Sequence, residues 1–268
     1  MTLQDVMIGE FPVDILIPAL CAGLLVIATH VPLGTQVLQR GIIFIDLAIA
    51  QVAGLGAYLV TMLLGPDAAG LWIQCGAVCL ALLASWLLVA TERLSARYQE
   101  PMIGIVFALA ATAVILLLAK DPQGGQHLSD LLAGQILWIG RSQILYSSLA
   151  TGVLLTALYF LRGRRGAFYS LFAIAITVSV QLVGVYLVFA TLIIPALATV
   201  ALGSSKVRLL MSYMTAVTGY GLGLIGSALF DLPTGPLIVW TLAATGLLSC
   251  FLSQYFLGYQ GGGQKSGR

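Results

Sequence analysis

Three polar side chains stand inside long apolar stretches of the sequence. Asp46 and Gln51 lie in GIIFIDLAIAQVAGLGAYLV, and Gln181 lies in ITVSVQLVGVYLV. Hydrocarbon offers these groups no water, and ionisable groups inside a membrane commonly border a wet cavity and mark a transport path. We therefore predict that Asp46, Gln51 and Gln181 line or gate a path, and that Asp46 is a candidate ligand for a metal ion.

Each of these residues also has a structural explanation. Asp46 follows Arg40 by six residues, so it could pair with that basic group or cap the backbone of its helix. Gln51, with two glycines just beyond it, could hold two closely packed helices together. Gln181 could belong to a kinked packing helix. The sequence leaves these alternatives open.

A second, weaker metal candidate lies in a polar loop. His127 has Asp121 and Asp130 nearby, and such groups can ligate metal ions. One histidine and two loosely spaced carboxylates are a sparse ligand set, so a solvated loop is the alternative.

Five residues are predicted to form kinks or turns: Gly184, Pro195, Asp231, Pro233 and Gly235. The first two interrupt the apolar run after Gln181, which is the pattern of a broken helix beside a transport path. The other three belong to FDLPTGP, where proline and glycine fix a tight turn and the aspartate can cap a helix through its side chain.

The sequence carries no enzymatic motif that we recognise. GYQGGGQKS has Gln264 where a Walker A loop needs glycine. The chain has only two histidines, His30 and His127, so it contains no HExxH helix of a zinc protease. A GxSxG nucleophile elbow is also missing. We expect no catalysis and no bound cofactor in this chain.

Composition indicates a membrane protein. Of the 268 residues, 60% are hydrophobic and 8% are charged, whereas soluble domains carry about 25% charged residues. The net charge is +2, and lysine and arginine form no cluster of the kind that binds phosphates, so we expect membrane lipid around the chain and no nucleic-acid partner.

Runs of about 20 apolar residues predict membrane-spanning helices. We expect an all-α, polytopic transmembrane bundle of eight to nine segments in one domain (1–257), followed by a disordered glycine-rich tail (258–268). The block 168–202 is too long for one span and is interrupted at Pro195, so we divide it into a full span and a shorter segment at about 190–202. Residues 131–140 are a candidate re-entrant or interfacial helix. The expected segments are 14–32, 42–64, 70–90, 102–119, 144–161, 168–188, a short one at 190–202, 207–230 and 236–257.

Basic residues predict the orientation, because they collect on the cytoplasmic side of membrane proteins. With the N-terminus outside, ten of the twelve lysines and arginines fall in the cytoplasm. Only Lys120 and Arg141 then fall outside, so we predict this topology.

Four motifs, co-linear over about residues 31–245, resemble those of one family. They are VPLGTQVLQRGIIFIDLAIAQVAGLG, MIGIVFALA, QLVGVYLVFATLIIPALATV and SALFDLPTGPLIV. They are similar to motifs of the membrane permeases of ABC importers for zinc, manganese and ferrous iron. Two positions depart from the family pattern, because Gln51 stands where relatives usually have histidine and Gln135 where they commonly have aspartate.

The resemblance implies a function and a set of partners. It implies a permease for divalent metal ions, zinc first and manganese or iron next, in a bacterial cytoplasmic (inner) membrane. It also implies a second permease copy, ABC ATPase subunits that use the ATP, and an extracytoplasmic metal-binding protein. The cytoplasmic segment that docks the ATPase in relatives is here RGRRG, so Arg162, Arg164 and Arg165 are the candidate contacts.

Other classes of function remain open at this point. They are a secondary metal carrier driven by an ion gradient, a permease for a metal chelate, and a structural membrane protein that transports nothing.

Overall fold

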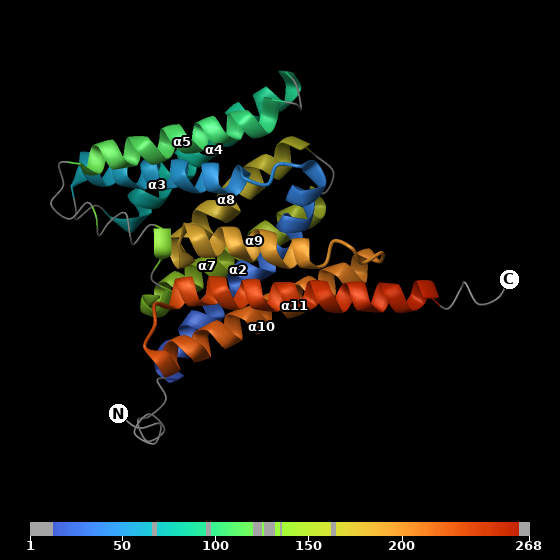
Figure 1. Ribbon diagram of the computed structural model, residues 1–268. Helices are drawn as coiled ribbons and strands as arrows, with labels where there is room; N and C mark the ends of the chain where they lie inside the picture. Colours follow the sequence, from blue (N-terminus) through green and yellow to red (C-terminus); the bar gives the residue numbers. More distant parts are fainter. Residues whose placement is uncertain are drawn as a thin grey trace.

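The computed structural model describes residues 13–65, 69–94, 98–119, 125, 132–134, 136–161 and 165–262. Within these ranges the chain forms nine α-helices, one 3₁₀ helix and no strand, which confirms the all-α prediction (Figure 1). The helices are α2 (Val13–Arg40), α3 (Ile45–Leu64), α4 (Gly70–Leu94), α5 (Gln99–Leu118), η2 (Ile136–Trp138), α7 (Arg141–Phe160), α8 (Arg165–Val183), α9 (Val185–Ala198), α10 (Ser205–Phe230) and α11 (Thr234–Gly262).

Eight of these helices are long and apolar enough to cross a membrane, and α9, with 14 residues, is a shorter ninth segment. The predicted bundle of eight to nine segments with one short member is therefore confirmed. The helices lie side by side, and α2 begins at the opposite end of the bundle from the end of α11 (Figure 1).

The short helix α9 lies at the centre of one half of the bundle. It packs against α2, α10 and α11, and ten of its 14 residues are buried. Hydroxyl pairs link it to α10, with Thr191 Oγ1 2.8 Å from Tyr220 Oη and Thr199 Oγ1 2.7 Å from Ser212 Oγ. Hydroxyls that satisfy one another can lie between helices without an unpaired polar group in the membrane.

The other half of the bundle is built around α3, which packs against α4, α5 and α8. Gly56 and Gly76 let α3 and α4 approach at backbone distance, since a Cβ on Gly56 would lie 2.5 Å from the Gly76 carbonyl oxygen. The expected close helix approach beyond Gln51 is therefore present, and α4 is the partner.

The break in the apolar block lies at Gly184, which is one of the two residues predicted to interrupt it and stands a few residues before the expected boundary between 188 and 190. Gly184 separates α8 from α9 with φ +81° and ψ 165°, a conformation that is essentially restricted to glycine. Pro195 lies inside α9. The expected segments 168–188 and 190–202 are therefore α8, which ends at Val183, and α9, which begins at Val185.

Helix α2 also continues past the residue where we expected it to end. Pro32 lies inside it and has no N–H to give to the carbonyl of Ala28, four residues earlier. Tyr213 of α10 donates its hydroxyl to that carbonyl at 3.1 Å. The neighbouring helix thus supplies the missing hydrogen bond, and α2 runs on to Arg40.

Residues 132–134 and 136–140 do not form the continuous helix that we considered for 131–140. They contain a short helical turn and η2, and Gly134 (φ +70°) meets the backbone at the α8–α9 break. A Cβ on Gly184 would lie 2.4 Å from the Gly134 nitrogen. The segment that carries Gly134 therefore packs directly against the break between α8 and α9.

Several predicted features fall outside the described residues. They include His127, Gln135, Arg162 and Arg164, and the side chain of Arg165 at the start of α8. Helix α11 extends to Gly262, five residues beyond the expected boundary of the domain at 257. The disordered tail stays a prediction.

Candidate transport path

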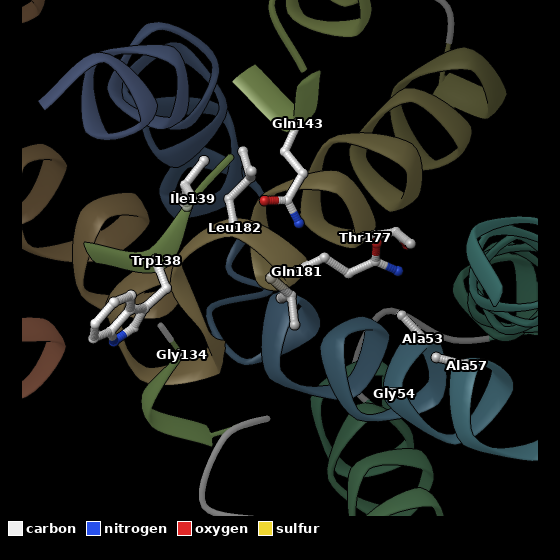
Figure 2. Close-up of a pocket in the computed structure, with 11 residues that line it drawn as sticks. Ala53, Gly54, Ala57, Gly134, Trp138, Ile139, Gln143, Thr177, Gln181 and Leu182 are labelled. Atoms are coloured by element: carbon white, nitrogen blue, oxygen red, sulfur yellow. The ribbon is translucent and has the colours of Figure 1, made fainter. Parts of the chain in front are cut away.

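A cavity of about 370 Å³ lies between α3, α8, the start of α7 and the segment that carries Gly134 (Figure 2). Its walls are mostly small or apolar, and the polar side-chain groups among the lining residues are two glutamine amides, one indole N–H and one hydroxyl. The lining residues are Ala53, Gly54, Ala57, Gly134, Trp138, Ile139, Gln143, Thr177, Val180, Gln181 and Leu182.

Gln181 is the one predicted path residue that lines this cavity. Its side chain extends from α8 toward Ala53 of α3 (Figure 2). Thr177, one turn earlier on α8, donates its hydroxyl to the Ala173 carbonyl at 2.8 Å. Thr177 is completely buried, so its hydroxyl bond stays within α8 and the side chain contributes to the cavity wall only by packing.

Gln143 is a lining residue that the sequence analysis missed. Its Oε1 accepts a hydrogen bond from the Gly140 backbone nitrogen at 2.8 Å, which caps the start of α7. Its amide nitrogen is therefore the group free to donate. Gln143 lies one residue before the expected span 144–161. Had we extended that span by one helical turn toward the N-terminus in looking for polar residues, Gln143 would have been included.

Asp46 lies in the first turn of α3 and is only 1% exposed. Neither of its carboxylate oxygens has a hydrogen-bond partner among the described residues. The backbone N–H groups of Asp46 and Leu47 lie near the carboxylate but outside hydrogen-bond geometry. The positive end of the helix dipole favours an acid at this position, so the capping explanation keeps some support.

The other structural explanation for Asp46 was an ion pair with Arg40, and the two side chains do not form this pair. The Arg40 guanidinium carbon lies 4.2 Å from the centre of the Phe168 ring, an arrangement in which the ring face attracts the cation. In the part of the chain that the structure describes, no basic group reaches Asp46.

Glu100, in the first turn of α5, is a second acid at this end of α3 and was also missed. It interacts electrostatically with Asp46. One of its oxygens accepts the Phe44 backbone N–H at 3.3 Å, and the other is buried without a partner in the described chain. In the sequence, Glu100 stands directly before Pro101 and the expected span 102–119. This position could have marked it as an acid at the start of a membrane helix.

Helix periodicity relates Asp46 to the cavity. Residues seven and eleven apart lie about 20° from one another around a helix, so Asp46 shares a face of α3 with the lining residues Ala53 and Ala57. At 1.5 Å per residue, Asp46 is about 10 Å along the axis from Ala53. Gln51 lies on a different face, is 3% exposed, and does not line the cavity.

Four of the five predicted turn residues, Gly184 and those of FDLPTGP, lie at the end of the bundle next to the cavity, and Pro195 lies inside α9. Asp231 ends α10 in the left-handed conformation (φ 52°), and its N–H bonds to the Ser227 carbonyl; no side-chain cap by Asp231 is seen among the described contacts. A Cβ on Gly235 would lie 2.4 Å from the Ala133 oxygen. The FDLPTGP turn therefore packs against the segment that includes Gly134.

Metal-ligating side chains are sparse in this arrangement. Nowhere in the described ranges do three or more His, Cys, Asp or Glu side chains gather into a possible metal site. Asp46 and Glu100 are a pair, so a metal ion beside them would need further oxygen ligands from backbone, water or another chain.

Comparison with known proteins decides the family. The model of the ABC 3 transport family matches residues 12–165 and 164–253. The chain belongs to the ABC 3 transport family. It is thus a multi-pass membrane permease of an ABC metal-ion importer, and the family resemblance found in its motifs is confirmed.

A solved structure supports the fold of this permease. PsaBC from Streptococcus pneumoniae in complex with Fab contains a chain that is similar to it, with a TM-score of 0.72 and 22% sequence identity over 96% of this chain and 98% of the other. At this identity the likeness concerns the fold. No curated protein sequence matches the permease.

Proposed function

We propose that this permease imports divalent first-row metal ions with energy from ATP. Two copies would form the translocation path, separate ABC ATPase subunits would use the ATP, and an extracytoplasmic binding protein would deliver the metal. In this proposal the chain lies in a bacterial cytoplasmic membrane, and Arg162, Arg164 and Arg165 contact the ATPase.

The observation that carries the proposal is the pair Asp46 and Glu100. Three of their four carboxylate oxygens are buried without a hydrogen-bond partner among the described residues. An acid buried without a partner is costly in its charged form, and a passing cation would stabilise that form. Because Asp46 shares a face of α3 with the cavity, a cation that leaves the cavity along this face reaches the carboxylate.

The choice of metal is the finer part of the proposal. The family resemblance placed zinc first, with manganese and iron next. The two acids offer only oxygen donors, which suit manganese better than zinc, whereas zinc binds imidazole and thiolate well. Competition between Zn²⁺, Mn²⁺ and Fe²⁺ for uptake, together with the metal content of cells that lack the gene, decides among them.

Substitution of Asp46 by asparagine tests the path, because it removes the charge and keeps the shape. Loss of one partner of a buried charge contact costs about 2–5 kcal/mol, so we expect uptake to fall at least about thirtyfold. Thermal stability in detergent should stay the same or rise, since a buried acid without a hydrogen-bond partner is removed.

The matched control is Asp14→Asn. Asp14 is also an acid in the first turn of a helix, but it is exposed. If Asp46 were only a helix cap, Asp46→Asn would lower the melting temperature and leave uptake per folded molecule unchanged. That pattern would remove Asp46 from the proposed path.

A secondary carrier driven by an ion gradient is the competing function. A buried membrane carboxylate such as Asp46 is also the kind of group that relays protons in such carriers. Metal uptake by the permease alone, in liposomes with a proton gradient and no ATP, would favour the carrier.

A further inference from the structure

Arg40 lies near two kinds of group that can bind its charge, an aromatic ring and a pair of acids. We propose that Arg40 is a cation that competes with the metal: its guanidinium rests on the Phe168 ring while the metal is admitted, and it moves to Glu100 when the metal leaves. This inference rests on the proposed import of divalent metal past Asp46 and Glu100, and it names the group that empties the acid pair.

The first argument is the present position of Arg40. It is the last residue of α2 and is half-buried, and its guanidinium carbon lies 4.2 Å from the centre of the Phe168 ring. The face of an aromatic ring attracts a cation, but two hydrogen bonds to a carboxylate hold an arginine more strongly. In this structure Arg40 therefore occupies the weaker of these two kinds of site.

The second argument is a buried contact that joins the same turn of α8 to Glu100. Tyr169 directly follows Phe168, and its hydroxyl accepts a hydrogen bond from the Gln99 amide at 2.7 Å. Both side chains are buried, so the bond is shielded from water. Gln99 is the first residue of α5 and Glu100 is the second. The turn of α8 that holds the arginine therefore also positions the acid.

The third argument is the short connection between Glu100 and Arg40. One oxygen of Glu100 accepts the Phe44 N–H at 3.3 Å, and Phe44 lies four residues after Arg40. The chain between them turns twice, since Ile42 donates its N–H to the last turn of α2 at 3.4 Å and Ile45 donates to the Ile42 carbonyl at 3.3 Å. In the proposal, rotation of the long Arg40 side chain brings its guanidinium to the second Glu100 oxygen, which is buried without a hydrogen-bond partner among the described residues.

The fourth argument is the helix that carries the ring. Phe168 is 4% exposed in the first turn of α8. Its ring packs edge-to-face on Tyr169, with centroids 5.5 Å apart, and lies 5.6 Å from the Phe172 ring. The ring is therefore fixed to α8 and moves with it.

The position of this ring connects Arg40 to the energy source of the proposed function. That function assigns the ATPase contact to the start of α8 and the residues directly before it. A shift of this helix end would change the Phe168–Arg40 contact and the Tyr169–Gln99 bond together. A partner that binds one of two such arrangements better than the other moves the equilibrium between them.

Replacement of the ring and of the arginine, singly and together, tests the inference. Phe168→Leu removes the ring face and keeps apolar bulk, and Arg40→Gln removes the charge. The permease is purified with its ATPase, and two quantities are measured: equilibrium binding of radioactive Mn²⁺ without nucleotide, and ATP-driven Mn²⁺ uptake after reconstitution with the binding protein. Binding by the Asp46→Asn variant gives the background.

The matched control is Arg208→Gln. Arg208 is also a half-buried arginine near a helix end, but it lies in α10 and donates to the Leu202 carbonyl at 2.9 Å. We expect its loss to leave Mn²⁺ binding and the rate of uptake per folded molecule close to those of the wild type.

We expect Phe168→Leu to weaken Mn²⁺ binding about tenfold, the result if Arg40 then occupies the acid about nine-tenths of the time. The double variant Phe168→Leu/Arg40→Gln should recover wild-type binding, because the competitor is gone. A merely structural role of Phe168 predicts weak binding in the double variant as well. Arg40→Gln alone should bind Mn²⁺ at least as tightly as the wild type and transport it about tenfold more slowly, since release lacks its competitor.

Three results would overturn the inference and leave metal import standing: unchanged binding in Phe168→Leu, weak binding in the double variant, or wild-type transport by Arg40→Gln. If Phe168→Leu fails to insert into the membrane, Arg40→Gln decides alone, through tight binding with slow transport or through transport at the wild-type rate. Failure of the wild-type transporter to accumulate Mn²⁺, Zn²⁺ or Fe²⁺ with ATP would overturn the proposed function itself.

Discussion

Substitution of Gly184 by alanine is the sharpest test of how the α8–α9 break is built. Gly184 has φ +81° and ψ 165°, and an L-residue in this region of backbone space pays about 1–3 kcal/mol. Its Cβ would also lie 2.4 Å from the Gly134 nitrogen and 2.7 Å from the Ala133 carbonyl carbon. Both neighbours are backbone atoms, so a flexible side chain cannot simply move aside.

Forced overpacking of this kind adds about 1–3 kcal/mol. The two contributions together predict that Gly184→Ala destabilises the permease by about 2–6 kcal/mol. For soluble domains of comparable size, each kcal/mol lowers the melting temperature by about 2–4 °C, so we expect a loss of at least about 4 °C.

The assay is the fraction of purified permease that remains monodisperse in detergent after heating to a series of temperatures. Gly152→Ala is the matched control, because Gly152 lies inside α7 with no atom within 4 Å of its would-be Cβ, and alanine there should stabilise the helix by about 0.5–1 kcal/mol. Equal melting curves for Gly184→Ala and the wild type would show that the break is not held by the Gly134–Gly184 contact.

Two further substitutions probe the packing around α9. Gly34→Ala should prevent stable insertion or folding, because its Cβ would lie 1.9 Å from the Leu192 carbonyl oxygen; normal membrane levels of this variant would contradict the close α2–α9 packing. Tyr220→Phe should lower stability by about 1 kcal/mol, since it removes the hydrogen bond to Thr191, and an unchanged melting temperature would show that this buried bond contributes nothing.

The number and nature of the helices could be predicted from the sequence, because apolar runs of spanning length leave few alternatives to membrane helices. Gly184 and Pro195 were both predicted to interrupt the apolar block, but the sequence could not show which of the two separates the helices. Pro195 was the stronger local signal, but a proline in a membrane helix is tolerated where neighbouring helices supply hydrogen bonds. The break instead lies at Gly184, where a second backbone, at Gly134, occupies the space that any side chain would need.

A polar residue inside an apolar sequence was easy to single out as a candidate. Gln181 stood out in this way, and it lines the cavity. Gln143 and Glu100 did not stand out, because each lies in the first turn of a helix, where polar residues are common. Their relevance depends on which helices meet there, and that is tertiary information.

Gln51 illustrates the opposite difficulty. It was as conspicuous in the sequence as Asp46, yet helix periodicity places it on another face of α3, away from the cavity wall. The sequence alone could not say which face of α3 would meet α8, so it could not separate the two residues.

In the proposed function, this permease carries divalent metal past Asp46 with energy from ATP. The most direct test is metal accumulation in proteoliposomes that contain the permease and its ATPase, with the binding protein supplied on the opposite side from ATP. We predict accumulation above equilibrium with ATP, none with a non-hydrolysable analogue, and a loss of at least about thirtyfold with Asp46→Asn. Accumulation without ATP, or at the wild-type rate with Asp46→Asn, would contradict the account.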